Sequence, residues 1–486
     1  MKSLPKTPSL ITLTALTIAL LTACGTIPNT VPNTIPKTAI PNPITKPSQP
    51  ITPGQPNTVE TQTITVINDL VKLEQGITRP AQALQLQSVG KLGAQAFIEH
   101  PWNYELVAKV AAPTTPNGVE VRATHITFNG KYAIVTYNRE GATFAGALEV
   151  YDISDTNHPI RISQALFDDM DANVVSSPDE DLTGITNGRL YVGGARKIAG
   201  TGHVRPAVLS EFSISNGHLG AGIKSIELDG YSTNSIARYG PLVMTSSGNA
   251  DCDNPTDPLR GGIAVTRSKI FETGSPLESL KLNTFCNSQA VAVHHAGTNE
   301  TSYLAALEAG IHGKLHIYNM SVPFKTNPSL LLNTSKHTID IGSVTPVDNK
   351  NSMDIHRGLV WVAAGNAGVK AFNLGTFSST PAYTLIADDV IGLTANSISI
   401  DGDTAYVAYG RGGVYVAQVP KCDDPTKIGA KHANCNNQVL PLENKALNWA
   451  GKFSDDSGSA NFVAAKDCLV FIANGEGGLR IVRRVK

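Results

Sequence analysis

Apolar and polar positions alternate over short stretches along most of the chain, and the pattern is clearest in residues 121–167. The first two predicted strands are joined by Asn129-Gly130, a dipeptide typical of tight hairpins. The last two are separated by a turn that ends in Pro159. The segment therefore predicts a four-stranded antiparallel meander, with strands at residues 121–128, 132–137, 147–154 and 160–167.

Similar units recur to the end of the chain, some of them interrupted by longer loops. Leu359 to Ala364 is continuously apolar, as expected for a strand that is buried on both faces. A single meander would expose such faces, so neighbouring units must pack against each other. The insertions leave a count of six to eight open, and we predict seven, with third strands near residues 150, 210, 264, 317, 371, 415 and 480.

The repeated motif V-x-V-A-x-G-x-x-G-V-x-V, which residues 360–371 match except for Ala371 at the last position, resembles the LVIVD-repeat β-propellers of bacterial surface proteins. Val150 to Ser154, with the downstream Pro159, matches the same family. The resemblance covers residues 101–486 and implies an all-β fold, a seven-bladed β-propeller of four-stranded antiparallel blades. It implies a scaffold more than a chemistry.

The last unit ends after its third strand, whereas residues 105–110 read as an additional strand before the first unit. We predict that 105–110 pairs with 478–484 and closes the ring, which would remove two open sheet edges. The alternative is an isolated edge strand.

The first 23 residues read as a signal peptide, with Lys2 and Lys6 before an apolar stretch over 10–21. Leu21-Thr22-Ala23-Cys24 resembles the bacterial lipobox, which implies cleavage before Cys24, a lipid on its thiol and anchoring in a membrane. Gly25 in place of Asp implies the outer membrane, with the protein on its periplasmic or cell-surface face. The alternative is an ordinary secretory signal.

Residues 24–58 are predicted to be a disordered, extended tether, since nine prolines fall between 25 and 58. Residues 59–100 form an N-terminal extension before the propeller. Val66 to Leu73, followed by Gly76, fits one short amphipathic helix with a glycine cap. Residues 81–98 are ambiguous and are expected to pack over one end of the ring.

Export allows disulfides, and we expect two of them. Cys422 and Cys435 flank a polar insertion, and Cys252 and Cys286 flank most of the third unit. Cys468 is expected to be free and buried. Zinc is a poorer interpretation, because no two cysteines lie two to four residues apart.

Net charge and the absence of two catalytic motifs narrow the range of possible functions. The net charge is -1 and only 16 % of residues are charged, so a nucleic-acid partner is not expected. Nucleophile-elbow and phosphate-loop motifs are absent from the sequence, and no cofactor is expected.

Histidines at predicted inner strands could converge on the channel of the propeller, although hydrogen-bonded imidazoles at strand ends are the default expectation. Two acidic groups could hold Ca²⁺, although turn and solvation roles are favoured. The histidines are His125, His294, His295 and His356. The acidic residues are Asp168, Asp169 and Asp171 with Asp179, Glu180 and Asp181, and separately Asp251, Asp253 and Asp257.

The sequence thus favours a membrane-anchored, non-enzymatic scaffold that binds a protein or glycan partner at the cell envelope. Three long loops, at 197–206, 249–261 and 421–437, are the expected contacts if they project from one end. The alternative is a propeller hydrolase or lyase with a metal or a His/Asp site in the channel.

Overall fold

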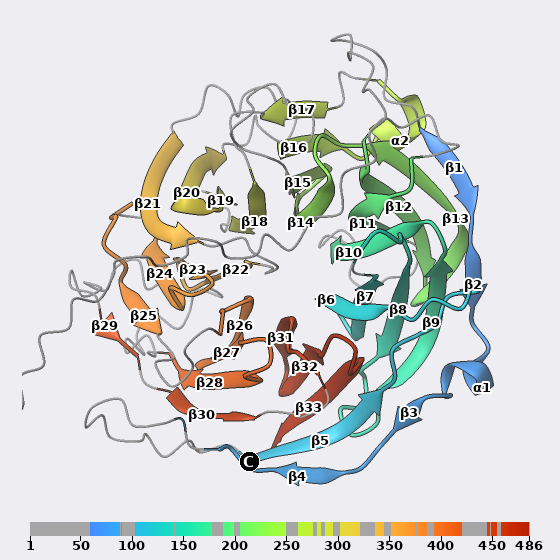
Figure 1. Cartoon of the computed structure of the whole chain (residues 1–486), viewed down its shortest axis with the longest axis horizontal. Coiled ribbons are helices and arrows are strands. Elements are labelled where there is room, and N and C mark those ends of the chain that lie inside the picture. Colours follow the sequence, from blue (N-terminus) through green and yellow to red (C-terminus); the bar gives the residue numbers. More distant parts are fainter. Residues whose placement is uncertain are drawn as a thin grey trace, which may run out of the picture. The chain divides into compact units, whose positions relative to one another are not determined.

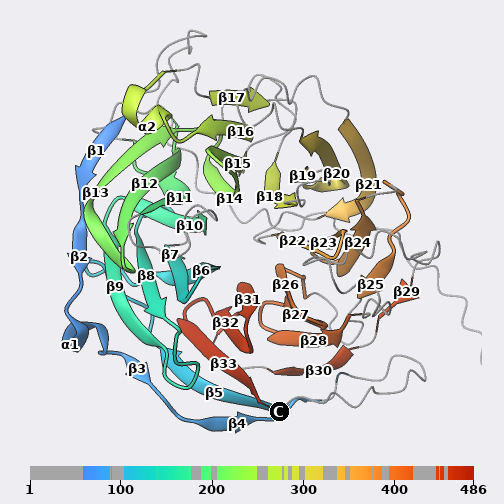
Figure 2. The ribbon, with the colours of Figure 1, turned by 180° about the vertical axis from the view of Figure 1, so that it is seen from behind.

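Seven antiparallel sheets stand around a central axis and form a closed β-propeller (Figures 1 and 2). The structure is a computed structural model. It describes residues 59–87, 89, 103–139, 141–176, 188–198, 205–248, 261–275, 279–282, 287–294, 302–320, 336–344, 351–374, 377–385, 393–419, 445–447, 449–453 and 458–485.

Each blade has four strands in order from the axis to the rim, and we number the blades along the chain. Blade 1 consists of β6 (Arg122–Asn129), β7 (Tyr132–Asn138), β8 (Gly146–Asp152) and β9 (Ile160–Phe167), and blade 2 of β10 (Met170–Ser176), β11 (Gly188–Arg196), β12 (Ala207–Ser215) and β13 (His218–Glu227). Blade 3 consists of β14 (Ser232–Tyr239), β15 (Leu242–Gly248), β16 (Gly262–Arg267) and β17 (Ser279–Leu282). Blade 4 consists of β18 (Ser288–His294), β19 (Ser302–Glu308), β20 (Gly310–Met320) and β21 (Lys336–Val344).

Blades 5 to 7 are completed in part by distant segments. Blade 5 consists of β22 (Met353–His356), β23 (Leu359–Ala363), β24 (Val369–Asn373) and β25 (Tyr383–Leu385). Blade 6 consists of β26 (Ser397–Asp401), β27 (Thr404–Ala408), β28 (Val414–Gln418) and β30 (Trp449–Phe453). Blade 7 consists of β31 (Phe462–Lys466), β32 (Leu469–Ala473), β33 (Leu479–Val485) and β5 (Asn103–Val110). The remaining elements are β1 (Glu60–Thr63), β2 (Thr65–Ile67), α1 (Leu70–Leu73), β3 (Ile77–Thr78), β4 (Gln82–Leu84), α2 (Ile270–Thr273) and β29 (Lys445–Ala446).

The core lies between the blades, as the continuously apolar strands predict. All five residues of β23 are buried, and alternate side chains face the two neighbouring blades. Between blades 7 and 1, Phe471 and Leu479 pack with Val135 and Tyr137. Since burying one such side chain stabilises by roughly 2 kcal/mol, the blades hold each other in the ring.

The predicted closure is confirmed. β5 pairs antiparallel with β33, from Leu479 opposite Val110 to Val485 opposite Asn103. The first and last strands of the propeller therefore share one blade, and neither is left as an open edge.

The glycines of the A-x-G-x-x-G motif have a role at the joints between blades. Gly365 exchanges two backbone hydrogen bonds with Ala395 of the next blade, and Gly410 does the same with Ala460. Within blade 7, at Gly478 with φ of +74°, a Cβ atom would lie 2.1 Å from the carbonyl oxygen of Val110 in β5. The motif thus lets neighbouring backbones approach closely.

The N-terminal extension differs from its prediction. Residues 65–67 form a strand on blade 1, and the helix is reduced to the single turn α1, capped by Asp69. The outer edge of β9 offers free backbone partners to Val66 and Ile67, and this tertiary pairing overrides the helical pattern.

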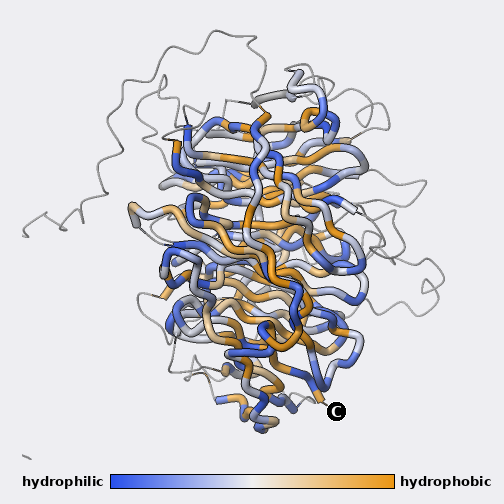
Figure 3. The backbone as a smooth tube through the Cα atoms, turned by 90° about the vertical axis from the view of Figure 1, so that its right-hand side faces the viewer, coloured by the Kyte–Doolittle hydropathy of each residue, from blue (hydrophilic) through white to orange (hydrophobic). Residues whose placement is uncertain are grey.

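The described part of the extension, residues 59–87, runs along the rim, and we call it the strap. Residues 90–98, most of the segment expected to pack over one end, lie outside the described residues. The strap pairs in turn with the outer strands of blades 2, 1 and 7 and then meets Lys452 of blade 6 through Gln87. Figure 3 shows it crossing the outer side of successive blades.

One further prediction is wrong, and one condition set on the long loops is not met by the strands that flank them. Cys468 is free, but it is exposed in a turn and not buried. Most residues of the three long loops lie outside the described ranges, but the flanking strands place their connections: 197–206 and 249–261 each join a second strand to a third, whereas 421–437 follows the third strand of its blade. Because successive strands run in opposite directions, the last loop leaves from the opposite end of the ring.

Cys24 and the proposed disulfide cysteines Cys252, Cys286, Cys422 and Cys435 lie outside the described residues, as do residues 1–58. In the part of the chain that the structure describes, neither helix is long and apolar enough to span a membrane.

Candidate functional site

The inner strands line the channel, and each has a strand partner on one side only. Their remaining backbone groups need partners, because unpaired buried donors and acceptors are costly. Polar side chains of one inner strand supply these partners to the next blade. We call three such side chains at alternate positions of one strand a column.

The clearest column lies on blade 5. Ser352 Oγ and Asp354 Oδ2 accept hydrogen bonds from the backbone N–H groups of Ile398 (3.2 Å) and Ile400 (2.8 Å). His356 Nε2 lies 3.0 Å from the carbonyl oxygen of Gly402. Because strand side chains alternate, the spacing of two places all three on one side of the strand.

Blade 6 repeats the arrangement. Ser397, Ser399 and Asp401 accept hydrogen bonds from the backbone N–H groups of the next blade, from Val463 (2.8 Å), Ala465 (3.0 Å) and Cys468 (3.4 Å). The two columns therefore link blades 5, 6 and 7 from the inside.

In blades 1 to 4, bulged inner strands provide the polar side chains that bond to the next blade. Each of these strands has an extra residue in its ladder: Thr124, Asn173, Asn234 or Gln289. Thr124 donates to the carbonyl oxygen of Ala172 (3.0 Å), and Asn234 donates to that of Ser288 (3.1 Å). The bulges thus re-aim polar side chains across the joints.

Two titratable groups of the blade 5 column are perturbed. Burial raises the pKa of Asp354 to about 6, opposed by the hydrogen bond from Ile400. Burial lowers the pKa of His356 to about 4, assisted by the nearby charge of Arg357. At neutral pH the imidazole is therefore uncharged, and its Nε2–H donates to Gly402. Both side chains bond to backbone groups of blade 6.

The predicted histidines do not form one site in the described structure. His125 packs against Phe462 with ring centroids 4.3 Å apart and the rings tilted by 45°, and its Nδ1 accepts from the N–H of Val175 at 3.4 Å. His294 and His356 end the inner strands of blades 4 and 5, as expected, while His295 lies outside the described residues. Within the described ranges, no three His, Cys, Asp or Glu side chains are grouped so that they could hold a metal ion.

The first acidic group has structural roles. Asp168 accepts from the N–H of Asn117 (3.1 Å), and Asp171 accepts from the N–H groups of Arg139 (3.2 Å) and Ala145 (3.0 Å). Asp169 binds Arg196. The remaining acidic candidates lie outside the described residues: Asp179, Glu180, Asp181, Asp251, Asp253 and Asp257.

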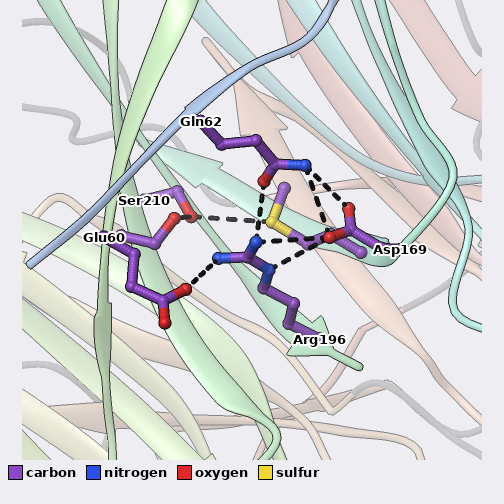
Figure 4. Close-up of polar contacts among 7 residues, drawn as sticks. Glu60, Gln62, Asp169, Arg196 and Ser210 are labelled. Atoms are coloured by element: carbon purple, nitrogen blue, oxygen red, sulfur yellow. Dashed lines mark hydrogen bonds and ion pairs between the residues drawn. The ribbon is translucent and has the colours of Figure 1, made fainter. Parts of the chain in front are cut away.

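Sequence reasoning missed the two polar clusters that hold the strap. In Figure 4, the guanidinium of Arg196 binds Glu60 (2.8 Å), Gln62 (2.9 Å) and Asp169 (3.3 Å), which joins the strap to blade 2. The Oγ of Ser210 donates to the sulfur of Met170 beside this cluster.

The second cluster is buried in blade 1. Glu149 is fully buried and binds Arg161, which donates to the carbonyl oxygens of Leu73 and Gln75 in the strap. Tyr137 and Tyr151 donate to the same carboxylate, and burial raises the pKa of both hydroxyls well above the usual value. A glutamate inside the apolar run 147–151 was the signal that could have revealed this cluster.

Geometry and sequence together define the class of protein: a closed seven-bladed β-propeller with a strap on its rim. No family model matches the chain, and no curated protein matches it.

Solved structures give distant likenesses. The computationally designed Ika8 protein is 10% identical, with a TM-score of 0.37, over 77% of this chain and 99% of its own. The WD40 propeller domain of Doa1 is 10% identical, with a TM-score of 0.44, over 79% and 98%. PorZ of Porphyromonas gingivalis, a surface component of its type-IX secretion system, is 14% identical, with a TM-score of 0.43, over 79% of this chain and 51% of PorZ.

Proposed function

We propose that this protein is an exported, lipid-anchored propeller of the LVIVD-repeat kind, which binds a protein or glycan partner at the outer membrane. The observation that carries the proposal is the use of the channel's polar side chains. Asp354, His356 and the serines of both columns bond to neighbouring blades, which suits a rigid scaffold. Binding is then left to the loops and the rim.

The N-terminal sequence supports the membrane location. Cys24 would carry the lipid, and the proline-rich segment to residue 58 would reach on the order of 100 Å from the bilayer. Such a spacer gives a tethered scaffold access to partners beyond the lipid surface.

Two experiments test the two halves of the proposal. Cys24→Ser should abolish incorporation of labelled palmitate and release the protein from the membrane fraction, and unchanged membrane retention would refute the anchor. Protein lacking residues 1–58, immobilised and exposed to outer-membrane extract, should capture a saturable partner. Heat-unfolded protein is the control, and equal capture by both would refute the binding role.

A further inference from the structure

The outer strands of the blades differ in whether a further segment pairs with them. β1 covers β13 of blade 2, β2 covers β9 of blade 1, and β3 and β4 cover β5 of blade 7. β29 lies parallel to β25 of blade 5, and Gln87 of the strap pairs with Lys452 in β30 of blade 6. Five blades therefore carry added backbone partners on their rim.

β21 of blade 4 is the exception among the long outer strands. It has nine residues with a bulge at Ile341, whose carbonyl oxygen accepts a hydrogen bond from Lys370 of blade 5 (2.6 Å), and no described segment pairs with its outer edge. In Figure 1 the strap lies alongside β13, β9 and β5, on the side of the ring away from β21. His337, Thr338 and Asp340 are exposed. An open edge of this length is a template for another strand.

The chain's own upstream segment is a poor occupant for this edge. Val59, where the described strap begins, packs at the joint of blades 2 and 3, so the preceding residues start near the uncovered side of the rim. Those residues hold nine prolines between 25 and 58. Proline lacks the N–H that a ladder needs, so a segment with this many prolines is a poor candidate for pairing along β21.

Side chains along β21 indicate what would fit. On one side of the strand, His337 stacks on Phe377 of blade 5 with ring centroids 3.8 Å apart, which forms an aromatic platform at the edge. On the other side lie Thr338 and the exposed carboxylate of Asp340, whose Oδ1 accepts from the N–H of Gly342. Lys314 of β20 is already the cross-strand partner of Asp340. Pairing on the outer edge therefore favours apolar or aromatic residues on one side and a basic residue beside Asp340 on the other.

We propose that β21 binds an extended segment of a partner protein, alternately apolar and basic, which adds to blade 4 as a fifth strand. This deepens the binding role proposed above and rests on it. Main-chain hydrogen bonds would supply affinity, and the platform and Asp340 would supply selectivity. The strap shows that this rim accepts such strands on three other blades.

The probe is a fluorescent heptapeptide, Lys-Val-Lys-Phe-Lys-Val-Lys, titrated against protein lacking residues 1–58 and followed by anisotropy. Binding should slow hydrogen exchange within 336–344. Asp340→Lys should weaken binding about fivefold or more, since one exposed charge pair contributes up to about 1 kcal/mol. Asp155→Lys, an exposed carboxylate on a turn of blade 1, is the matched control and should have little effect.

Two altered peptides test the backbone pairing. Replacing the central Phe by Pro should abolish binding, and grouping the four lysines at one end should weaken it strongly. Equal binding of all three peptides, or unchanged exchange in 336–344, would overturn the inference. A partner captured from the extract that protects other surfaces would also overturn it while leaving the scaffold role standing. Heptapeptide binding at β21 with no captured partner would support the edge and count against the proposed function.

Discussion

Asp354 and His356 should give the ring opposite responses to pH. The pKa of Asp354 is raised from 3.8 to about 6, so the folded state binds the proton more tightly than the unfolded state. Its contribution to stability therefore falls as the pH rises from about 4 to about 6. The pKa of His356 is lowered from 6.5 to about 4, so the unfolded state binds that proton more tightly, and stability is lost as the pH falls through the same range.

The two effects are similar in size. Each pKa shift changes the free energy of unfolding by about 3 kcal/mol over its full pH range. About half of this change occurs between pH 6.5 and pH 5. In the wild-type protein the two contributions largely cancel. Asp354→Asn should therefore lose about 1.5 kcal/mol more than wild type on acidification over this window, and His356→Gln should gain about as much. Both replacements keep a group that can bond to Ile400 or Gly402.

The assay is urea unfolding at pH 5, 5.5, 6 and 6.5, followed by circular dichroism, with each variant compared to wild type at the same pH. His312→Gln, at an exposed position, is the control for loss of a histidine. Parallel pH profiles for Asp354→Asn and wild type would refute the assignment of the perturbed carboxyl to this joint.

Two further substitutions test the strap and the close backbone contact. Arg161→Leu should destabilise by about 3–5 kcal/mol in thermal or urea unfolding, because it leaves the buried Glu149 carboxylate without its cation. Lys131→Ala, which breaks an exposed ion pair, should cost under about 1 kcal/mol, and equal losses would contradict the role of the buried pair. Gly478→Ala should lower the free energy of unfolding by about 1–3 kcal/mol, because the added methyl group would clash with β5. Gly130→Ala is the control and should cost about 1 kcal/mol or less, because its site has open space. The same unfolding curves measure both losses, and equal losses would contradict the close contact at Gly478.

The ring and its closure could be predicted because they depend on local, repeated signals. The apolar run 359–364 needs two covered faces, and the surplus strand at 105–110 needs an edge. The strap could not be predicted in the same way. Thr65 to Ile67 pairs with β9 because of where the chain passes, and a short apolar segment has no periodicity that distinguishes this strand from a helix.

The error at Cys468 has a specific cause. Asp467 and Cys468 have φ of 50° and 73°, nearly the values of Arg357 and Gly358 (52° and 72°) in the equivalent hairpin of blade 5. Cys468 therefore occupies a turn position where blade 5 has glycine, and a turn places the thiol in solvent. Aligning the copies on their hairpins, instead of on their apolar runs, would have predicted the exposure.

Within the site, the polar columns could have been read from the repeats, since Asn351-Ser352 and Asn396-Ser397 begin equivalent strands. What the sequence does not contain is the identity of each side chain's partner. His356 was a candidate ligand by position, yet its Nε2 bonds to a carbonyl oxygen of the next blade. That distinction depends on the height of one inner strand against another, which only packing determines.

The joint between blades 7 and 1 has a different inner arrangement from the joints between blades 5, 6 and 7. At the three column positions of blade 7 stand Phe462, Ala464 and Lys466, so only Lys466 keeps a hydrogen bond across the joint, to the carbonyl oxygen of Gly130 (2.7 Å). Phe462 instead packs against His125 in a tilted arrangement. This is the joint where the two ends of the propeller meet, and it has fewer inner hydrogen bonds than the joints between blades 5, 6 and 7. On the outer side, β2 of the strap pairs with β9 of blade 1, and β3 and β4 pair with β5 of blade 7, so one continuous segment ties the two blades together across this joint from the rim.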